Sequence, residues 1–365
     1  MDPKLILVGA IILVALGFDF INGFHDAANS IATVVSTKVL TPRQAVVLAA
    51  VTNLLGAMWG TAVAKTISSG LIDAKLVAMT SDIMICALLG AIIWDLLTWW
   101  FGLPTSSSHA LIGGLCGSAL AASGGNWKVI VWAQPSPQHW WLGKGVLWKV
   151  IVPMVTSPLA GFVLGFALMA LLYVLLQNAR PLAVNRFFGR AQMVSAGAMG
   201  FMHGTNDAQK TMGIIALTLF AATQAGHLEH APAWLSFLRT THDPGTAGIA
   251  LWIKITCAFV MAAGTAVGGW RIIRTLGHKM VKLQPINGLA AETSSALVIL
   301  TATSLGIPVS TTHNISAAIM GVGAARRLNA IKWTVVERMV WAWILTIPVT
   351  ALLAYLFVRL LRALG

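Results

Sequence analysis

One stretch of the chain occurs twice. Residues 102–117 read GLPTSSSHALIGGLCG, and residues 306–321 read GIPVSTTHNISAAIMG. Both copies have a glycine, an apolar residue, a proline, a run of hydroxyl residues and a histidine in the same order. The spacing of 204 positions, from 102 to 306, recurs for GTAV, which stands at 60–63 and again at 264–267. The chain therefore consists of two related halves.

A third repeated segment carries an acidic residue in each copy. FINGFHDAAN at 20–29 aligns with FMHGTNDAQK at 201–210, which matches Asp26 with Asp207. This pair is spaced more closely than the others, because a polar insert at about 222–245 has only a short turn as its counterpart in the first half. We expect a first repeat, a short basic link and a second repeat, at 1–177, 178–192 and 193–365.

The composition is that of a membrane protein. Hydrophobic residues make up 57% of the chain and charged residues only 10%, whereas about 25% are charged in an ordinary soluble domain. Charge-free runs reach the roughly 20 residues with which a helix crosses a bilayer core. Strand-like alternation is absent, so the sequence predicts an all-α integral membrane protein in contact with the lipid bilayer. The helical spans are expected at about 4–37, 44–64, 76–101, 146–177, 192–220, 247–270, 285–305 and 333–361.

The basic residues fall between the apolar spans. The formal net charge is +13, but no aromatic platform accompanies the lysines and arginines, so we expect cytoplasmic loops and no nucleic-acid partner. The links at 178–192 and 271–282 are then inside, and the insert at about 222–245 is outside. The turn with Lys38 and Arg43 is also inside under this assignment, which gives the two halves inverted topologies.

The repeated stretch interrupts a helix in each half. The uncharged run at 96–127 is too long for a single crossing and contains Pro104 beside a polar cluster. These features predict a re-entrant helical hairpin at about 102–122, and the second copy predicts another at about 306–325. Pro104 and Pro308 favour the first turn of a helix, which places the hydroxyl residues at a helix start.

The two hydroxyl clusters form a candidate anion site. A helix start offers free backbone N–H groups and the positive end of the helix dipole. Brought together at the bilayer midplane, two such starts form one site for a tetrahedral oxyanion, with neutral donors and no fixed arginine or lysine. The predicted ligands are Ser106, Ser107, Ser108, Ser310, Thr311 and Thr312.

Oxygen-bearing side chains of the third repeated segment form a candidate cation site. Ionisable residues are costly inside a membrane span, which favours a functional role for them. Hard oxygen ligands suit a small cation such as Na⁺, and a buried carboxylate can instead take a proton. Hydrogen bonding between helices is the alternative role. The candidates are Asp26, Asn29, Asn206, Asp207 and Gln209.

Other polar residues also stand inside the spans. Glu292 lies near a hydroxyl pair and breaks the symmetry, because the first half has Leu88 at its position. A histidine beside these motifs either orients the loop or carries a proton. The four histidines concerned are His25, His109, His203 and His313. The three cysteines lack CxxC spacing, so we expect no metal site.

Four motifs resemble the inorganic phosphate transporter (Pit) family. They are NGFHDAANSIAT at 22–33, GLPTSSSHALIGG at 102–114, HGTNDAQKTMG at 203–213 and AETSSALVILTATSLGIPVSTTH at 291–313. The resemblance covers essentially the whole chain. It implies a cation-coupled symporter for orthophosphate, with inverted repeats, two re-entrant hairpins and a homodimeric assembly.

Carried over residue by residue, the resemblance assigns phosphate contacts to the hydroxyl clusters and coupling or gating to acidic positions. The first set is Ser106, Ser107, Ser310, Thr311 and Thr312. The second set is Asp26, Asn29, Asp207 and Glu292.

Asn53 is a further gating or coupling position, because the eukaryotic relatives have a glutamate there. Its asparagine resembles the bacterial low-affinity branch, in which proton coupling and carriage of divalent metal–phosphate complexes are described. Coupling to H⁺ and coupling to Na⁺ therefore both stay open. The resemblance also implies a multi-pass protein of the bacterial plasma (inner) membrane that needs no cofactor.

Two other functions fit part of this pattern. Sulfate has the shape of phosphate, so one alternative is a carrier for another oxyanion; only phosphate keeps a proton to donate to a nearby carboxylate. The other is an intramembrane phosphoester hydrolase acting through Ser108 and His109 or through Asp26. A nucleophile needs a base and an orienting group in one place, whereas these residues come as symmetric pairs. We therefore expect a transporter without catalytic residues.

Overall fold

The computed structural model describes residues 3–69, 71–73, 76–77, 79–135, 143–229, 231–244 and 248–364. Within these ranges the chain is helical, and its β-structure is limited to isolated bridges. The α-helices are α1 (Pro3–Ser36), α2 (Pro42–Ala57), α3 (Ala62–Ser69), α4 (Ser81–Phe101), α5 (Ser107–Ala122), α6 (Val152–Leu175), α7 (Pro181–Gln224), α8 (Leu251–Val267), α9 (Trp270–Arg274), α10 (Pro285–Ser304), α11 (Thr311–Arg326) and α12 (Trp333–Leu364).

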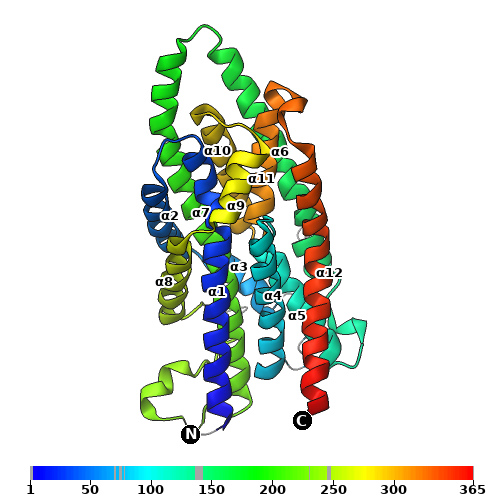
Figure 1. Ribbon diagram of the computed structural model, residues 1–365. Coiled ribbons are helices and arrows are strands. Elements are labelled where there is room, and N and C mark those ends of the chain that lie inside the picture. The colour runs from blue at the N-terminus through cyan, green and yellow to red at the C-terminus, as the bar shows by residue number, and fades with distance from the viewer. Residues whose placement is uncertain are drawn as a thin grey trace.

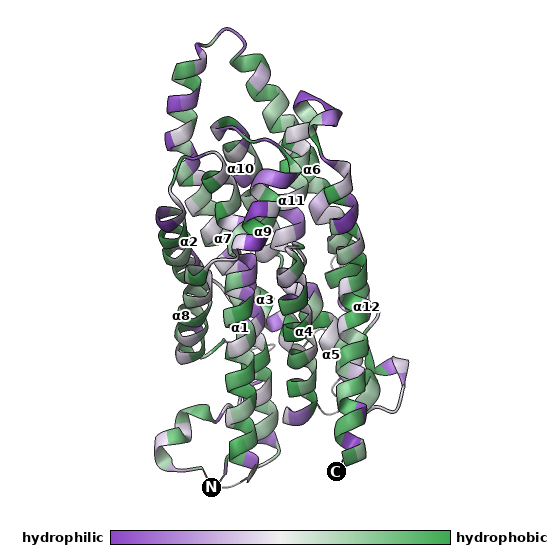
Figure 2. Ribbon diagram, viewed as in Figure 1, coloured by the Kyte–Doolittle hydropathy of each residue, from purple (hydrophilic) through white to green (hydrophobic). Residues whose placement is uncertain are grey.

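Several of these helices are long and apolar enough to cross a membrane. Four described helical segments qualify alone, namely α1, α4, α12 and α6 with the π-helical turn Leu147–Ile151 before it. Two bent pairs qualify together: α2 with α3, bent by 70°, and α8 with α9 and the π-helical turn Thr275–Met280, bent by 57°. The prediction of an all-α integral membrane protein is confirmed at this level. Figure 2 shows hydrophobic residues over most of α1, α4, α8 and α12, with hydrophilic residues on α9.

The GxP stretch ends one helix and begins another in the same way in both halves. Gly102 and Gly306 end α4 and α10 with φ angles of 65° and 63°, a left-handed conformation that glycine adopts without strain. Ser106 and Ser310 then cap α5 and α11 by accepting hydrogen bonds from the His109 and His313 backbone amides. The two helix starts therefore fall at equivalent positions of the two repeats.

The prediction for the two prolines is wrong in one respect. Pro104 and Pro308 lie in the extended segments two residues before the N-caps, and not in the first turn of a helix. At an N-cap, a serine hydroxyl accepts a hydrogen bond from a first-turn backbone N–H group, which a proline side chain cannot do. The serines therefore set the helix starts.

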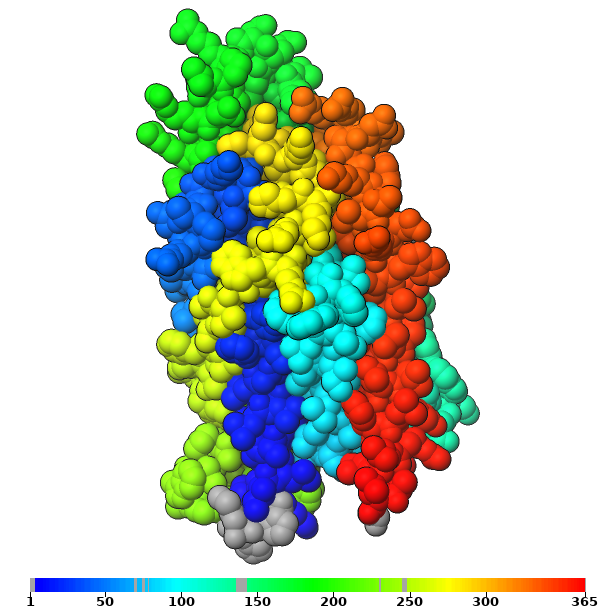
Figure 3. Space-filling model, in the orientation of Figure 1, coloured from blue at the N-terminus to red at the C-terminus, as the bar shows by residue number. Residues whose placement is uncertain are grey.

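Helices of one half pack against helices of the other half, in the same pattern for both repeats. α1 packs on α8 and α7 packs on α2; likewise α5 packs on α12 and α11 on α6. Glycines permit the first of these contacts, because a Cβ atom on Gly23 would collide with the Met261 backbone and one on Gly204 with the Asn53 backbone. Figure 3 shows α1, α4 and α12 side by side on one face, with α9 above α4.

The two helix pairs that flank the repeated stretch lie toward opposite ends of the molecule. In Figure 1, α4 and α5 lie toward the end that holds both chain termini, and α10 and α11 lie toward the other end. α1 runs away from the terminal end, whereas α7 runs back toward it from the junction with α6. Much of the predicted link at 178–192 is helical, because α7 begins at Pro181. Residues 230 and 245 of the predicted insert lie outside the described residues.

Candidate functional site

The segments 102–108 and 306–312, here called the hairpin tips, join α4 to α5 and α10 to α11 and meet inside the protein. The Ser108 hydroxyl lies 3.4 Å from the Val309 carbonyl oxygen, and the centroids of the His109 and His313 rings are 4.9 Å apart. The structure brings both predicted hydroxyl clusters to this point, and none of their six residues is more than 3% exposed. Ser106 and Ser310 are engaged as N-caps. The hydroxyls that line the junction are therefore those of the next two residues in each segment, namely Ser107, Ser108, Thr311 and Thr312.

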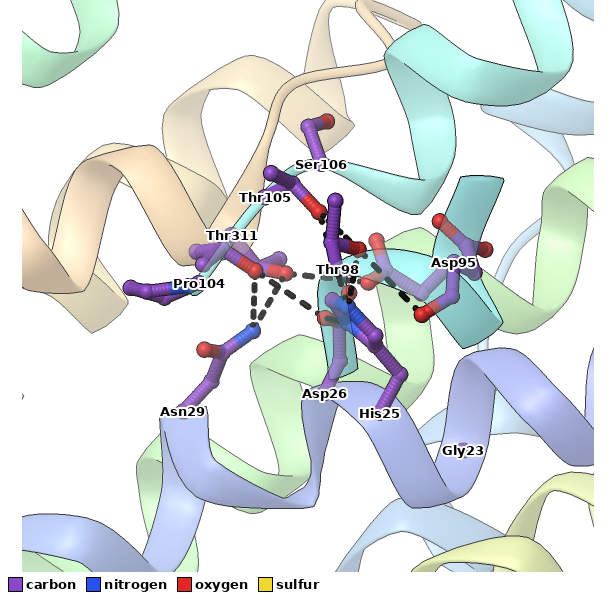
Figure 4. Close-up of polar contacts among 12 residues, drawn as sticks. Gly23, His25, Asp26, Asn29, Asp95, Thr98, Pro104, Thr105, Ser106 and Thr311 are labelled. Atoms are coloured by element: carbon purple, nitrogen blue, oxygen red, sulfur yellow. Dashed lines mark hydrogen bonds and ion pairs between the residues drawn. The ribbon is translucent and has the colours of Figure 1, made fainter. Parts of the chain in front are cut away.

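The acidic residue of the first half contacts the hydroxyl cluster of the second. Thr312 donates a hydrogen bond to Asp26 over 3.1 Å, and the Asn29 amide donates to Thr311 and Thr312 over 3.1 and 2.9 Å. Figure 4 shows Asp26 and Asn29 on α1 directed toward Thr311. A contact between α1 and α11 thus unites predicted cation and anion ligands.

The acidic residue of the second half contacts the same cluster. Thr311 donates to the Asp207 carboxylate over 2.9 Å, and His203 Nε2 lies 3.1 Å from that carboxylate. One ligand atom each from Asp26, His203 and Asp207 lies within 4.8 Å of the other two. Two carboxylates and adjacent hydroxyls this close together have the donor set of a small-cation site.

His25 ties Asp26 to its surroundings. His25 Nδ1 is 2.7 Å from Asp26, and its Nε2 is 3.2 Å from the Thr98 hydroxyl on α4. Thr105 in turn donates to Thr98 over 2.9 Å, which joins the first hairpin tip to α1 (Figure 4). His25 therefore connects the acidic centre to the first hairpin, a role that the motif pattern left open.

Lys210 overturns the expectation of an anion site without a fixed cation. Its ammonium group contacts the Asp207 carboxylate and the Ser108 hydroxyl and donates to the Val309 carbonyl over 3.2 Å. The residue is only 1% exposed although it is charged. The signal was present in the sequence, because Lys210 ends the repeated segment FMHGTNDAQK and aligns with Asn29.

Asn53 and Asn206 lie around the acidic pair. Asn53 donates to Thr265 over 3.0 Å and contacts His203 Nδ1 at 3.0 Å, so it stands behind the histidine that faces Asp207. Asn206 donates to Thr303 over 2.8 Å, and its carbonyl oxygen is buried without a hydrogen-bond partner among the described residues.

Gln209 and Glu292 have separate surroundings. Gln209 accepts from the Val63 amide over 2.8 Å and donates to the Trp59 carbonyl over 3.2 Å, so it holds the bend between α2 and α3. Glu292 accepts hydrogen bonds from Thr33, Gln192 and Ser195 and is fully buried. The structure therefore does not bring these two predicted residues into direct contact with the hairpin tips.

Comparisons with known proteins show which family this chain is similar to. The model of the phosphate transporter family matches residues 22–354. A "probable low-affinity inorganic phosphate transporter" of Rhizobium meliloti (strain 1021) is 46% identical over 98% of this chain and 97% of its own length. A protein of the same description from Bacillus subtilis (strain 168) is 42% identical, with 97% of this chain and 96% of the relative covered.

A solved structure has the same fold. It is described as the sodium-dependent phosphate transporter, and it matches with a TM-score of 0.76 and 23% identity over 98% of this chain and 100% of its own. The fold and the relatives together define a membrane transporter and not an enzyme, so the hydrolase alternative is excluded. The chain belongs to the phosphate transporter family, whose substrate is inorganic phosphate.

Proposed function

We propose that this protein imports inorganic phosphate by symport with a cation. The observation that carries the proposal is the pair of adjacent hydroxyls at the start of α11, which contact carboxylates from both halves of the chain. Thr312 donates to Asp26 and Thr311 donates to Asp207. An anion at this helix start therefore lies beside two carboxylates. Lys210 contacts the Asp207 carboxylate, and we assign the offset of the repulsion from Asp26 to a mobile cation.

The phosphate ligands in this proposal are the hydroxyls of the two helix starts with their first-turn amides. The N-terminal ends of α5 and α11 supply positive dipole ends from opposite halves. Phosphate at neutral pH retains a proton that it can donate to Asp26 or Asp207, whereas sulfate has none. The two carboxylates thus favour phosphate over an oxyanion of the same shape.

Alternating access follows from the burial of the site. The acidic residues and the hydroxyls are almost fully buried, so no ligand reaches them without movement of the chain. The matching packing between helices of the two halves and the opposite directions of α1 and α7 support two inverted repeats with re-entrant hairpins (Figure 1). We assign the opening movement to the hairpin tips.

The remaining assignments extend this mechanism. Asp26, Asn29, Asn206 and Asp207 are the cation-coupling group, and either Na⁺ or H⁺ serves as the coupling ion. Glu292 and Asn53 act in gating, because each joins helices of the two halves without touching the hairpin tips. The protein works as a homodimer in the bacterial inner membrane and carries phosphate alone or as a divalent metal–phosphate complex.

The test is uptake of labelled phosphate into proteoliposomes under an inward Na⁺ gradient, an inward proton gradient or neither, with excess sulfate as competitor. The proposal expects uptake that one gradient stimulates and that sulfate leaves unchanged. Uptake that sulfate suppresses would identify a general oxyanion carrier. Uptake that no gradient stimulates would remove the symport mechanism.

A further inference from the structure

Lys210 stands where the first repeat has an uncharged residue. The aligned segments place it opposite Asn29, and each of the two residues follows the repeated aspartate by three positions on α1 or α7. Residues three apart on a helix lie on the same face. Asn29 and Lys210 therefore occupy equivalent places beside Asp26 and Asp207.

The two places differ in charge. The Asn29 amide group donates to Thr311 and Thr312, while its carbonyl oxygen is buried without a hydrogen-bond partner among the described residues. Lys210 instead directs its ammonium group at the Asp207 carboxylate. Each carboxylate thus faces one histidine, His25 beside Asp26 and His203 beside Asp207, but only the Asp207 half also contains an ammonium group. The Asp26 half has the free amide oxygen of Asn29 in its place.

The ammonium group of Lys210 has the surroundings of a bound cation. It contacts three kinds of oxygen, namely the Asp207 carboxylate, the Ser108 hydroxyl and the Val309 main-chain carbonyl. Carboxylate, hydroxyl and carbonyl oxygens are the ligands that hard cations take in proteins. Two of these oxygens belong to the hairpin tips, so the cation position lies against the proposed phosphate site.

We propose that the Lys210 ammonium is a tethered cation, which permanently fills the cation half-site of the second repeat. The mobile coupling cation then binds only at the Asp26 half-site. This inference rests on the proposed cation-coupled phosphate transport, and it specifies how many cations the hairpin junction exchanges. The protein carries one mobile cation fewer per phosphate than two symmetric half-sites would carry.

The test restores the symmetric residue with the substitution Lys210→Asn. Equilibrium binding of ²²Na⁺ to the purified full-length protein is measured in the presence of phosphate. The expected result is one more Na⁺ bound per chain than in the wild type, whatever number the wild type binds. An unchanged number of bound ions in a folded Lys210→Asn protein would overturn the inference.

Two further variants separate the vacated half-site from a general effect of the substitution. Lys210→Arg keeps the positive charge, and the double variant Asp207→Asn with Lys210→Asn removes the carboxylate that a sodium ion would need. Both are expected to lack the additional sodium ion that Lys210→Asn binds. An extra ion in either variant would place the gained site elsewhere and contradict the proposal.

Thermal unfolding covers the case in which Lys210→Asn is too unstable for binding measurements. Sodium replaces the missing ammonium in this account, so the variant should unfold at a higher temperature in sodium chloride than in choline chloride, by a larger margin than the wild type. Equal margins, or failure to fold even in sodium, would contradict it. Phosphate uptake by the wild type tests the underlying transport function separately, so the two failures are distinguishable.

Discussion

The Thr312 hydroxyl at the start of α11 donates a 3.1 Å hydrogen bond to the Asp26 carboxylate on α1. The two residues come from opposite halves of the chain and from the two motif types, hydroxyl cluster and acidic segment. Their contact links the proposed phosphate site to the proposed cation site over one hydrogen bond. Any change in the charge of Asp26 therefore changes the electrostatic potential at the anion position.

Asp26→Asn should abolish gradient-driven phosphate uptake while leaving the protein folded and inserted. The amide keeps the size of the side chain and removes the negative charge that attracts the coupling cation. Gradient-stimulated uptake in proteoliposomes measures the effect. Asp82→Asn, at the start of α4 and away from the hairpin tips, is the matched control and should retain stimulation. Normal stimulation in Asp26→Asn would remove this residue from the coupling site.

Ser107→Ala and Thr311→Val should each raise the apparent KM for phosphate. Each removes one donor to a charged ligand, a loss of about 1.5–3 kcal/mol or roughly 10- to 150-fold in affinity. Initial uptake rates over a range of phosphate concentrations give the value. Thr301→Val, an exposed hydroxyl on α10, should leave KM unchanged. A KM within error of the wild type in either site variant would exclude that side chain from the phosphate site.

Breaking the buried pair between Asp207 and Lys210 should destabilise the protein strongly. Removal of one member leaves the other charge buried without its partner, which costs about 3–5 kcal/mol. Asp207→Asn should therefore unfold at a lower temperature than the double variant Asp207→Asn with Lys210→Met, measured in detergent without sodium. Additive effects of the two substitutions would show that the charges do not interact.

Gly204→Ala should disturb the contact between α2 and α7. The added methyl group would collide with the Asn53 backbone, and overpacking of this kind costs about 1–3 kcal/mol. Gly197→Ala on the same helix is the control, because its Cβ would lie 3.6 Å from Leu48 and Thr52, an ordinary contact. Unfolding temperatures of the two variants should differ clearly, and equal values would argue against the close approach of these helices.

The breaks before α5 and α11 could be predicted from the sequence because their signals are local. Gly102 and Gly306 end their helices, and Ser106 and Ser310 cap the next ones, all within the repeated stretch. The repeat in the sequence also aligns Asp26 with Asp207. Both residues do reach the hairpin tips.

Other features depend on contacts between distant parts of the chain. The span expected at 44–64 is broken between α2 and α3, at a bend that Gln209 holds by accepting from the Val63 amide. The prediction of an anion site without a fixed arginine or lysine was wrong for a similar reason. The repeat alignment marks the position of Lys210, but its contact with Ser108 joins α7 to the first hairpin tip, and no local pattern predicts that contact.

The central claim is that phosphate at the hairpin tips and a cation at Asp26 bind together. The most direct test is equilibrium binding of labelled phosphate to the purified protein at low and high Na⁺ and at two pH values, in the wild type and in Asp26→Asn. Coupling between two sites is reciprocal, so the account predicts that one cation tightens phosphate binding in the wild type and has no effect in the variant. Phosphate affinity that depends on neither cation in the wild type, or that keeps its full cation dependence in Asp26→Asn, would contradict it.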